Sequence, residues 1–216
     1  MKDFCKYFAE DKPRYTLEEI EVKRENVINM IERKVDKRIT VANIISVMTG
    51  DFLLEIVQKI DEEFFENKLL NAFSDYNCTL SLCLDNKCTS VAGRCLHSKT
   101  WNKEGNKSCR RITIKLMSKV FIDSFKNTKI SQRAVDNVKC SNILECFLLV
   151  LEHELVHAIL FCKCIDMENT DKGLGDWSGI TRPGNGHSKT FMSILFNVFG
   201  HTKFTHELER GMKVME

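Results

Sequence analysis

The chain has 216 residues and a mass of 25.0 kDa, which suits one domain with a sizeable core and excludes a multidomain machine. Hydrophobic residues make up 43% of the chain and charged residues 29%, which excludes a disordered protein. The 32 basic and 30 acidic side chains leave a net charge of +2. Overall charge therefore predicts neither nucleic acid nor membrane as a partner, and only a local charge pattern could do so.

The N-terminal residues are polar and charged, without the apolar run of a secretory signal. No stretch reaches the roughly 18 apolar residues that a membrane span needs. In such a chain the ten cysteines are expected to stay reduced and to serve mostly as small buried side chains. We therefore expect a soluble intracellular protein.

The first 50 residues are predicted to be helical. Thr16 and Glu19 have the spacing of a capping box, and a second short helix is predicted from Thr40. An amphipathic helix is predicted over residues 51–66, where apolar residues recur at helical spacing. Its apolar face consists of Phe52, Leu53, Ile56, Val57, Ile60 and Phe64.

Two later segments alternate between apolar and polar residues, as strands do: one around Leu82 and one around Ile114. Residues 89–96, which include Gly93, are predicted as a third strand, and residues 98–108 as a polar connection. Together these segments predict a small three-stranded antiparallel sheet.

A helix is predicted to follow Asn142, a good N-cap, and its apolar residues cover more than one face, so it should be central. A last helix is predicted over residues 188–199, with Gly200 as its C-cap. The expected fold class is α+β, a small sheet packed with helices.

The central helix carries His153, Glu154 and His157 in the pattern H-E-x-x-H. Residues four apart lie on the same face of a helix, so both imidazoles could bind one Zn²⁺ ion. Glu154 could act as general base for a water molecule at the metal. Two histidines and a glutamate would be costly in an apolar helix without a partner, and a metal explains all three.

A catalytic zinc site needs a third protein ligand. The metzincin pattern is excluded, because Leu160 and Lys163 stand where it requires Gly and His. Glu168 is one candidate. His187 is the better one, because it lies at the start of the last amphipathic helix, where a helix terminus fixes its direction.

In their order along the chain, these elements resemble the SprT-like zinc metalloproteases, the group that includes Spartan. The resemblance is carried by the Phe-rich helix over 51–66, the strands with Gly93, the H-E-x-x-H helix, and Gly186-His187 followed by Phe191. It covers about residues 50–200. It implies a zincin-like protease domain over 51–200, between an N-terminal helical extension over 1–50 and a C-terminal tail over 201–216.

The resemblance also implies one catalytic Zn²⁺ held by His153, His157 and His187, with Glu154 as the base. The implied activity is endopeptidase cleavage of proteins bound or crosslinked to DNA, as in DNA–protein crosslink repair, with localisation in the nucleus or at sites of DNA replication. Many members carry a four-Cys zinc ribbon after the core, whereas this chain has no Cys after Cys164. Ser188 replaces the usual small residue after the third His.

A local excess of basic residues supports nucleic-acid binding. Between residues 94 and 119, eight basic side chains face Glu104 alone, a balance of +7. Trp101 could stack on an unpaired base, which favours single-stranded DNA. The alternative is a solvated charged face on an edge strand. The predicted contact residues are Arg94, Lys99, Trp101, Lys103, Lys107, Arg110 and Arg111.

Two other functions remain open: a nucleic-acid-binding module with a structural zinc, and a zinc peptidase unrelated to DNA. Glu154 argues against the first, because a structural site needs no base. The additional oxyanion donor also stays open, with Arg182, His201 and His206 as candidates. A second zinc site would lack any C-x-x-C spacing and would have to draw on Cys78, Cys83, Cys88, Cys95, Cys109 and His97.

Overall fold

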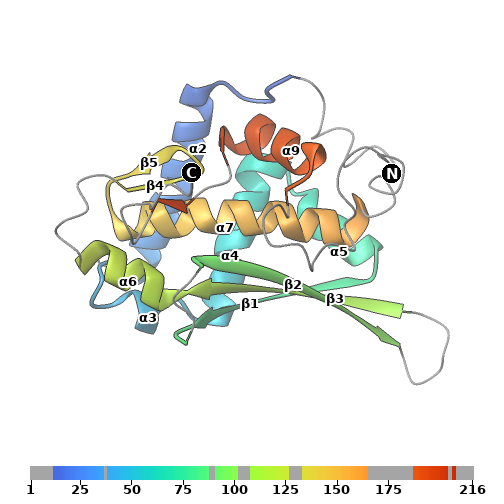
Figure 1. Cartoon of the computed structure of the whole chain (residues 1–216), viewed down its shortest axis with the longest axis horizontal. Coiled ribbons are helices and arrows are strands. Elements are labelled where there is room, and N and C mark those ends of the chain that lie inside the picture. Colours follow the sequence, from blue (N-terminus) through green and yellow to red (C-terminus); the bar gives the residue numbers. More distant parts are fainter. Residues whose placement is uncertain are drawn as a thin grey trace, which may run out of the picture.

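A computed structural model describes residues 12–36, 38–87, 91–101, 108–126, 133–164, 187–203 and 206–207. Within these residues the chain forms seven α-helices, one π-helical turn, a three-stranded sheet and a second small sheet. The predicted α+β class is confirmed at this level. Figure 1 shows a long helix, α7, running across the middle of the molecule, with the main sheet on one side of it and helix α9 on the other.

The N-terminal half contains the predicted helices. Helix α2 (Leu17–Val35) begins at Thr16 with the predicted capping box and ends at Asp36 in a left-handed conformation. Helix α3 (Ile44–Val47) starts later than predicted, because the Asn43 side chain accepts a hydrogen bond from the Thr40 backbone and forms a turn first. Helix α4 (Gly50–Phe65) matches its prediction within one residue, with Thr49 as N-cap.

The main sheet differs from the prediction in its topology. It consists of β1 (Cys78–Asp85), β2 (Gly93–Trp101) and β3 (Ser108–Met117) in the order β1-β3-β2. Strand β3 pairs parallel with β1 and antiparallel with β2, so the prediction of an antiparallel sheet was wrong. The physical reason is burial: Ile112, Ile114 and Leu116 of β3 are each 0% exposed, which favours the central position.

Strand β2 lies at the edge, and its inward positions are Gly93, Cys95 and His97, a poorly apolar set. It is longer than predicted, because residues 98–101, predicted as a connection, continue the strand. Helices α5 (Leu69–Asp75) and α6 (Ser118–Lys126) and the small sheet were not predicted. That sheet is formed by β4 (Arg133–Val135), β5 (Val138–Cys140) and β6 (His206–Glu207).

Helix α7 (Ile143–Ile159) is the centre of the fold. Asn142 caps it as predicted, and a π-helical turn, η1 (Leu160–Cys164), follows its last residue. The helix packs on β2 and β3 with one face and on α9 (Lys189–Phe199) with another. Nearly every side chain from Ile143 to Ile159 is buried, which confirms that the helix is packed on several sides.

Helix α2 contributes to the same core. Ile20, Val27 and Ile31 are buried in one hydrophobic cluster with residues of α4, α7 and α9, and α2 packs directly on α4. Among the described residues, no helix combines the length and the apolar character needed to cross a membrane.

Ile31 and Val22 offer a matched test of how strongly α2 supports the core. Ile31 is 0% exposed and Val22 is 58% exposed, on the same helix. We expect Ile31→Ala to lower the free energy of unfolding by about 3 kcal/mol, because it leaves a cavity in the core. Val22→Ala should change it by less than about 0.5 kcal/mol. Urea unfolding measures both, and equal small effects would mean that α2 is an appendage.

Candidate metal centre

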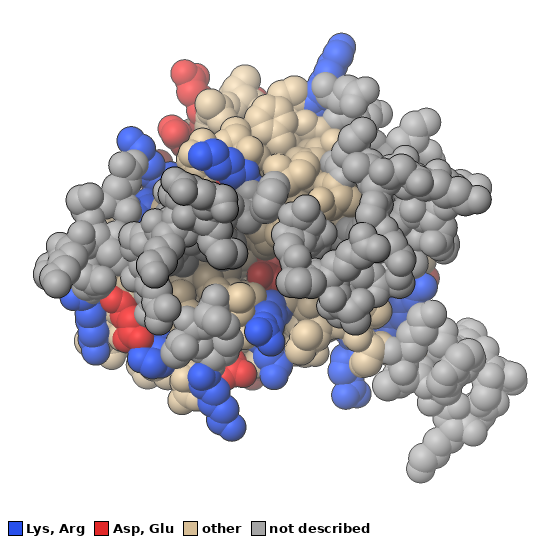
Figure 2. Space-filling view, in the orientation of Figure 1, with Lys and Arg blue, Asp and Glu red and all other residues tan. Residues whose placement is uncertain are grey.

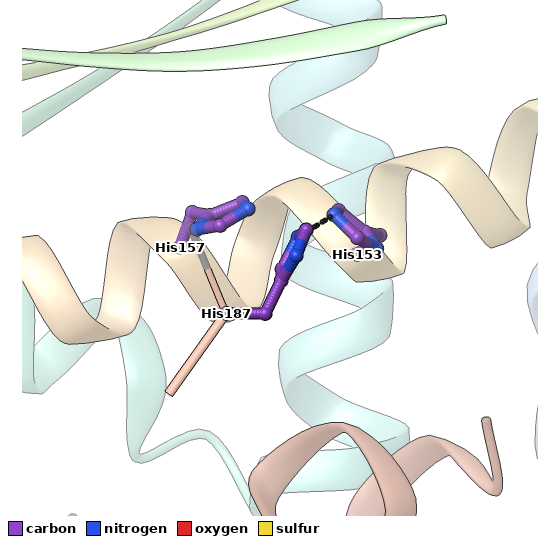
Figure 3. Close-up of side chains that lie close together, drawn as sticks. All are labelled: His153, His157 and His187. Carbon is purple, nitrogen blue, oxygen red and sulfur yellow. Dashed lines mark hydrogen bonds between the residues drawn. The ribbon is translucent and has the colours of Figure 1, made fainter. Parts of the chain in front are cut away.

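Three histidines from two segments lie together where the end of α7 meets the start of α9, with His153 buried and the other two half-buried. His153 and His157 project from the same face of α7, and His187 stands just before α9, next to its N-cap Ser188. Figure 3 shows the three rings turned toward one another. Their ligand nitrogens all lie within 4.8 Å of one another, and the Nε2 atoms of His153 and His187 are 3.1 Å apart.

The geometry fits a metal ion. The ring centroids are 5.0 Å apart for His153 and His187, and 5.1 Å apart for each pair that includes His157. In a tetrahedral zinc site with Zn–N bonds of about 2.05 Å, ligand nitrogens lie about 3.3 Å apart. The group could therefore hold a metal after small adjustments.

His187 is held in the form that binds metals. Burial and the nearby His153 lower the pKa of His187 to about 4, although the charge of Asp136 opposes this shift. Its imidazole is therefore neutral at physiological pH. Neutral imidazole is the form that has a lone pair for a metal.

Asp136 orients His153. Its Oδ2 lies 2.6 Å from His153 Nδ1, and its side chain is completely buried. Burial alone would raise the pKa of Asp136, but hydrogen bonds from His153 and His201 outweigh burial and lower it. An ionised carboxylate can only accept, so His153 Nδ1 donates and Nε2 keeps its lone pair toward the other two histidines.

Asp136 was not among the predicted site residues. The residues Val135-Asp136-Asn137-Val138 carry a signal of a tight hairpin, and both Asp136 and Asn137 have positive φ (52° and 72°). That signal would have predicted the turn between β4 and β5. It would not have shown that the turn reaches His153, because this contact depends on how the hairpin packs on α7.

A single aromatic ring supports all three histidines. The Phe191 ring in α9 has its centroid 5.0 Å from that of His153, 4.4 Å from that of His157 and 4.6 Å from that of His187. Phe191 is 0% exposed. It restricts the rotamers of the three rings and excludes water from one side of the cluster.

Glu154 is buried against the edge strand. Its side chain would be 2.5 Å from a Cβ atom at Gly93, so only glycine leaves room for it there. Burial and the charge of Asp136 raise the pKa of Glu154 to about 8, while the Cys95 backbone N–H and Arg94 favour the ionised form. Its Oε2 atom is buried without a hydrogen-bond partner among the described residues.

The predicted nucleic-acid contacts are divided between the two faces of the sheet. Arg94 and Arg111 are exposed on the outer face, away from α7. Arg110 points inward, where its Nη1 donates to the carbonyl oxygens of Phe161 (3.0 Å) and Cys162 (2.8 Å) after α7. Figure 2 shows basic side chains with acidic ones among them on the part of the molecule where the sheet lies.

Some predicted residues lie where the structure gives no side-chain description. Lys99 and Trp101 belong to β2, but their side chains are not described, and Lys103, Lys107, Glu168, Arg182 and Cys88 lie outside the described residues. His206 begins β6, again without a described side chain. His201 is buried between Asp136 and Glu152, so both of its ring nitrogens face protein groups and not a substrate.

The cysteines whose side chains are described do not gather into a second metal site. These seven cysteines are free thiols. By strand register, Cys78 and Cys95 lie on the inner face of the sheet and Cys83 and Cys109 on the outer face. In the part of the chain that the structure describes, the three-histidine cluster is the only group of three or more His, Cys, Asp or Glu ligands found close enough to hold a metal ion.

Comparisons with known proteins add no relative: no family model, no curated protein and no solved structure matches this chain.

The three-histidine cluster predicts one bound metal ion per chain. We expect His157→Ala and His187→Ala each to weaken Zn²⁺ binding by more than 100-fold, since each removes one of three ligands. Competition with a chromophoric chelator measures the affinity. His97→Ala is the control, because His97 lies on β2 outside the cluster and contacts Phe161. Unchanged affinity in both ligand variants would exclude a metal site at this place.

Proposed function

We propose that the protein is a zinc-dependent endopeptidase that cleaves proteins bound or crosslinked to DNA. The observation that carries the proposal is the position of Glu154: a buried carboxylate follows the first histidine of the cluster, and one of its oxygens has no hydrogen-bond partner in the described residues. A metal site that served only to hold the fold together would need no such group.

Zinc is the metal that the ligand set favours. Three neutral imidazoles with a fourth position left for water are typical of catalytic zinc, and harder ions prefer carboxylate ligands. When bound, zinc would polarise a peptide carbonyl and make a water molecule more acidic.

Glu154 would act as the general base and then as the general acid. Burial and the charge of Asp136 raise the pKa of Glu154 to about 8, and the charge of a bound cation would lower it toward the range in which an ionised carboxylate accepts a proton from water and passes it to the leaving amine. The Cys95 backbone N–H fixes the carboxylate, and the absence of a side chain at Gly93 leaves space for it. Phe191 keeps the three histidines in place.

The DNA part of the proposal rests on the outer face of the sheet and on the resemblance to SprT-like proteases. Arg94 and Arg111 are exposed there, together with Ser98, which faces Arg111 across the strand pair. Among the described elements, α7 packs on the opposite face of β2 and β3. A flat surface with arginines and hydroxyl groups suits a phosphate backbone, and Trp101 at the end of β2 would stack on an unpaired base.

Glu154→Gln is the direct test of the peptidase. We expect it to bind zinc as the wild type does and to lose at least about 100-fold in cleavage of a basic DNA-binding protein, because the base is removed. Cleavage is measured with and without single-stranded DNA at matched zinc content. We expect single-stranded DNA to stimulate the wild type.

Gly93→Ala gives an independent variant that keeps the carboxylate and displaces it. A Cβ atom at 2.5 Å must push Glu154 away, and a misplacement of about 1 Å can cost about 100-fold in rate. If zinc and DNA bind but wild type and variants alike cut nothing, the binding module with a structural zinc replaces the peptidase. If Glu154→Gln loses cleavage but DNA does not change the cleavage rate of the wild type, the protein is a zinc peptidase unrelated to DNA.

The outer face can be tested apart from catalysis. We expect Arg94→Ala with Arg111→Ala to weaken binding of single-stranded DNA and to reduce the slope of log affinity against log salt by about 1.4, since two phosphate contacts are lost. Arg33→Ala with Arg38→Ala removes the same charge from exposed residues outside the sheet and should have little effect. Fluorescence anisotropy at several salt concentrations measures both, and equal effects would exclude the outer face as the binding surface.

A further inference from the structure

A continuous chain of hydrogen-bonded ionisable side chains leads from His153 to helix α2. Asp136 Oδ2 lies 2.6 Å from His153 Nδ1 and 3.0 Å from His201 Nδ1. His201 Nε2 lies 2.8 Å from Glu152 Oε2. Arg24 closes the chain with a bidentate contact to Glu152, at 2.9 Å from Nε to Oε1 and 2.7 Å from Nη2 to Oε2.

This hydrogen-bonded chain of side chains joins parts of the fold that are distant in sequence. Arg24 belongs to α2, Glu152 and His153 to α7, Asp136 to the turn between β4 and β5, and His201 follows the C-cap of α9. Asp136 and His201 are 0% exposed and Glu152 is 1% exposed. Arg24 lies at the edge, and it also donates to the carbonyl oxygen of Phe199.

Basic and acidic side chains alternate along this hydrogen-bonded chain. Both ring nitrogens of His201 face carboxylate oxygens, and ionised carboxylates only accept hydrogen bonds. The order along it is Arg24, Glu152, His201 and Asp136, and each member contacts the next through a hydrogen bond. Removing any one charge leaves a buried neighbour uncompensated.

We propose that Asp136, His201, Glu152 and Arg24 act as positioning residues for the metal centre, fixing the orientation and tautomer of His153 from as far away as helix α2. The inference rests on the metal site of the proposed function, and it adds four residues that orient one of the three ligands.

Asp136 is suited to this role because its own position is fixed twice. Its backbone carbonyl accepts hydrogen bonds from the N–H groups of Thr202 and Lys203, both at 3.2 Å, and its side chain lies between two imidazoles. These hydrogen bonds join the segment after α9 to the β4–β5 turn that carries the carboxylate. A change at His201 would alter how strongly Asp136 holds His153, because the two histidines share the same oxygen atom.

The test compares metal binding in Asp136→Asn, His201→Gln and Arg24→Met with the wild type. We expect the first two to weaken Zn²⁺ binding by about 10- to 100-fold, the usual range for groups that orient a ligand. Arg24→Met should weaken it less, in the same direction, and Arg24→Lys should restore part of the loss. The visible spectrum of the Co²⁺-substituted protein should shift in each weakened variant, because it reports the geometry of the ligands.

Asp61→Asn is the matched control for loss of stability alone. Asp61 is 3% exposed, and its two oxygens accept from the backbone N–H groups of Leu69 at 2.8 Å and Leu70 at 3.0 Å, between α4 and α5. The control should lower the denaturation midpoint without changing Zn²⁺ affinity or the Co²⁺ spectrum.

Wild-type Zn²⁺ affinity and spectrum in folded His201→Gln and Arg24→Met would overturn the inference. If His201→Gln does not fold, the Zn²⁺ affinities of Arg24→Met and Arg24→Lys test the inference instead. Arg24 lies at the partly exposed end of the hydrogen-bonded chain, so its variants are expected to fold. If the wild type itself binds no zinc, the metal site is excluded, and both the inference and the proposed function are wrong. If the wild type binds zinc but cleaves no protein, only the peptidase proposal fails, and the affinities still decide the role of the positioning residues.

Discussion

The fold depends on burying three consecutive ionisable side chains in the middle of an apolar helix. Glu152, His153 and Glu154 of α7 are each 1–3% exposed. Leaving such groups without partners would cost more than the helix gains by packing, so surrounding elements must bring charges or hydrogen-bond donors to them. Helix α2 brings Arg24, the β4–β5 turn brings Asp136, and strand β2 brings the Cys95 backbone N–H. The arrangement of elements around α7 follows from these demands.

Gly93 and Phe191 position the side chains of the site, as the charged partners position the buried groups of α7. Gly93 lets the edge strand approach Glu154 closely, and Phe191 touches all three histidines at once. One of these residues acts through the absence of a side chain and the other through a large rigid one. Both act on groups that belong to other elements, so each of them joins the packing of the core to the geometry of the site.

Elements that depend on interactions between near neighbours in the sequence could be predicted, and contacts between distant segments could not. The caps Thr16, Asn142 and Gly200 and the helical periodicity predicted α2, α4, α7 and α9, because these signals act within a few residues. The three histidines were also predictable, since a helical repeat and a helix start fix their directions. Strand order was not, because β3 gains its central place by burial against α7. Arg110 looked like part of a basic surface, and only the register of β3 turns it inward.

The separation of the ligands along the chain means that a bound ion would also act as a cross-link. His157 and His187 are 30 positions apart, so an ion bound by both would close a loop of the chain much as a disulfide does. A cross-link of this kind lowers the entropy of the unfolded chain, and it forms only while the metal is present. The resistance of this protein to heat would then depend on the free concentration of the ion as well as on its amino acids.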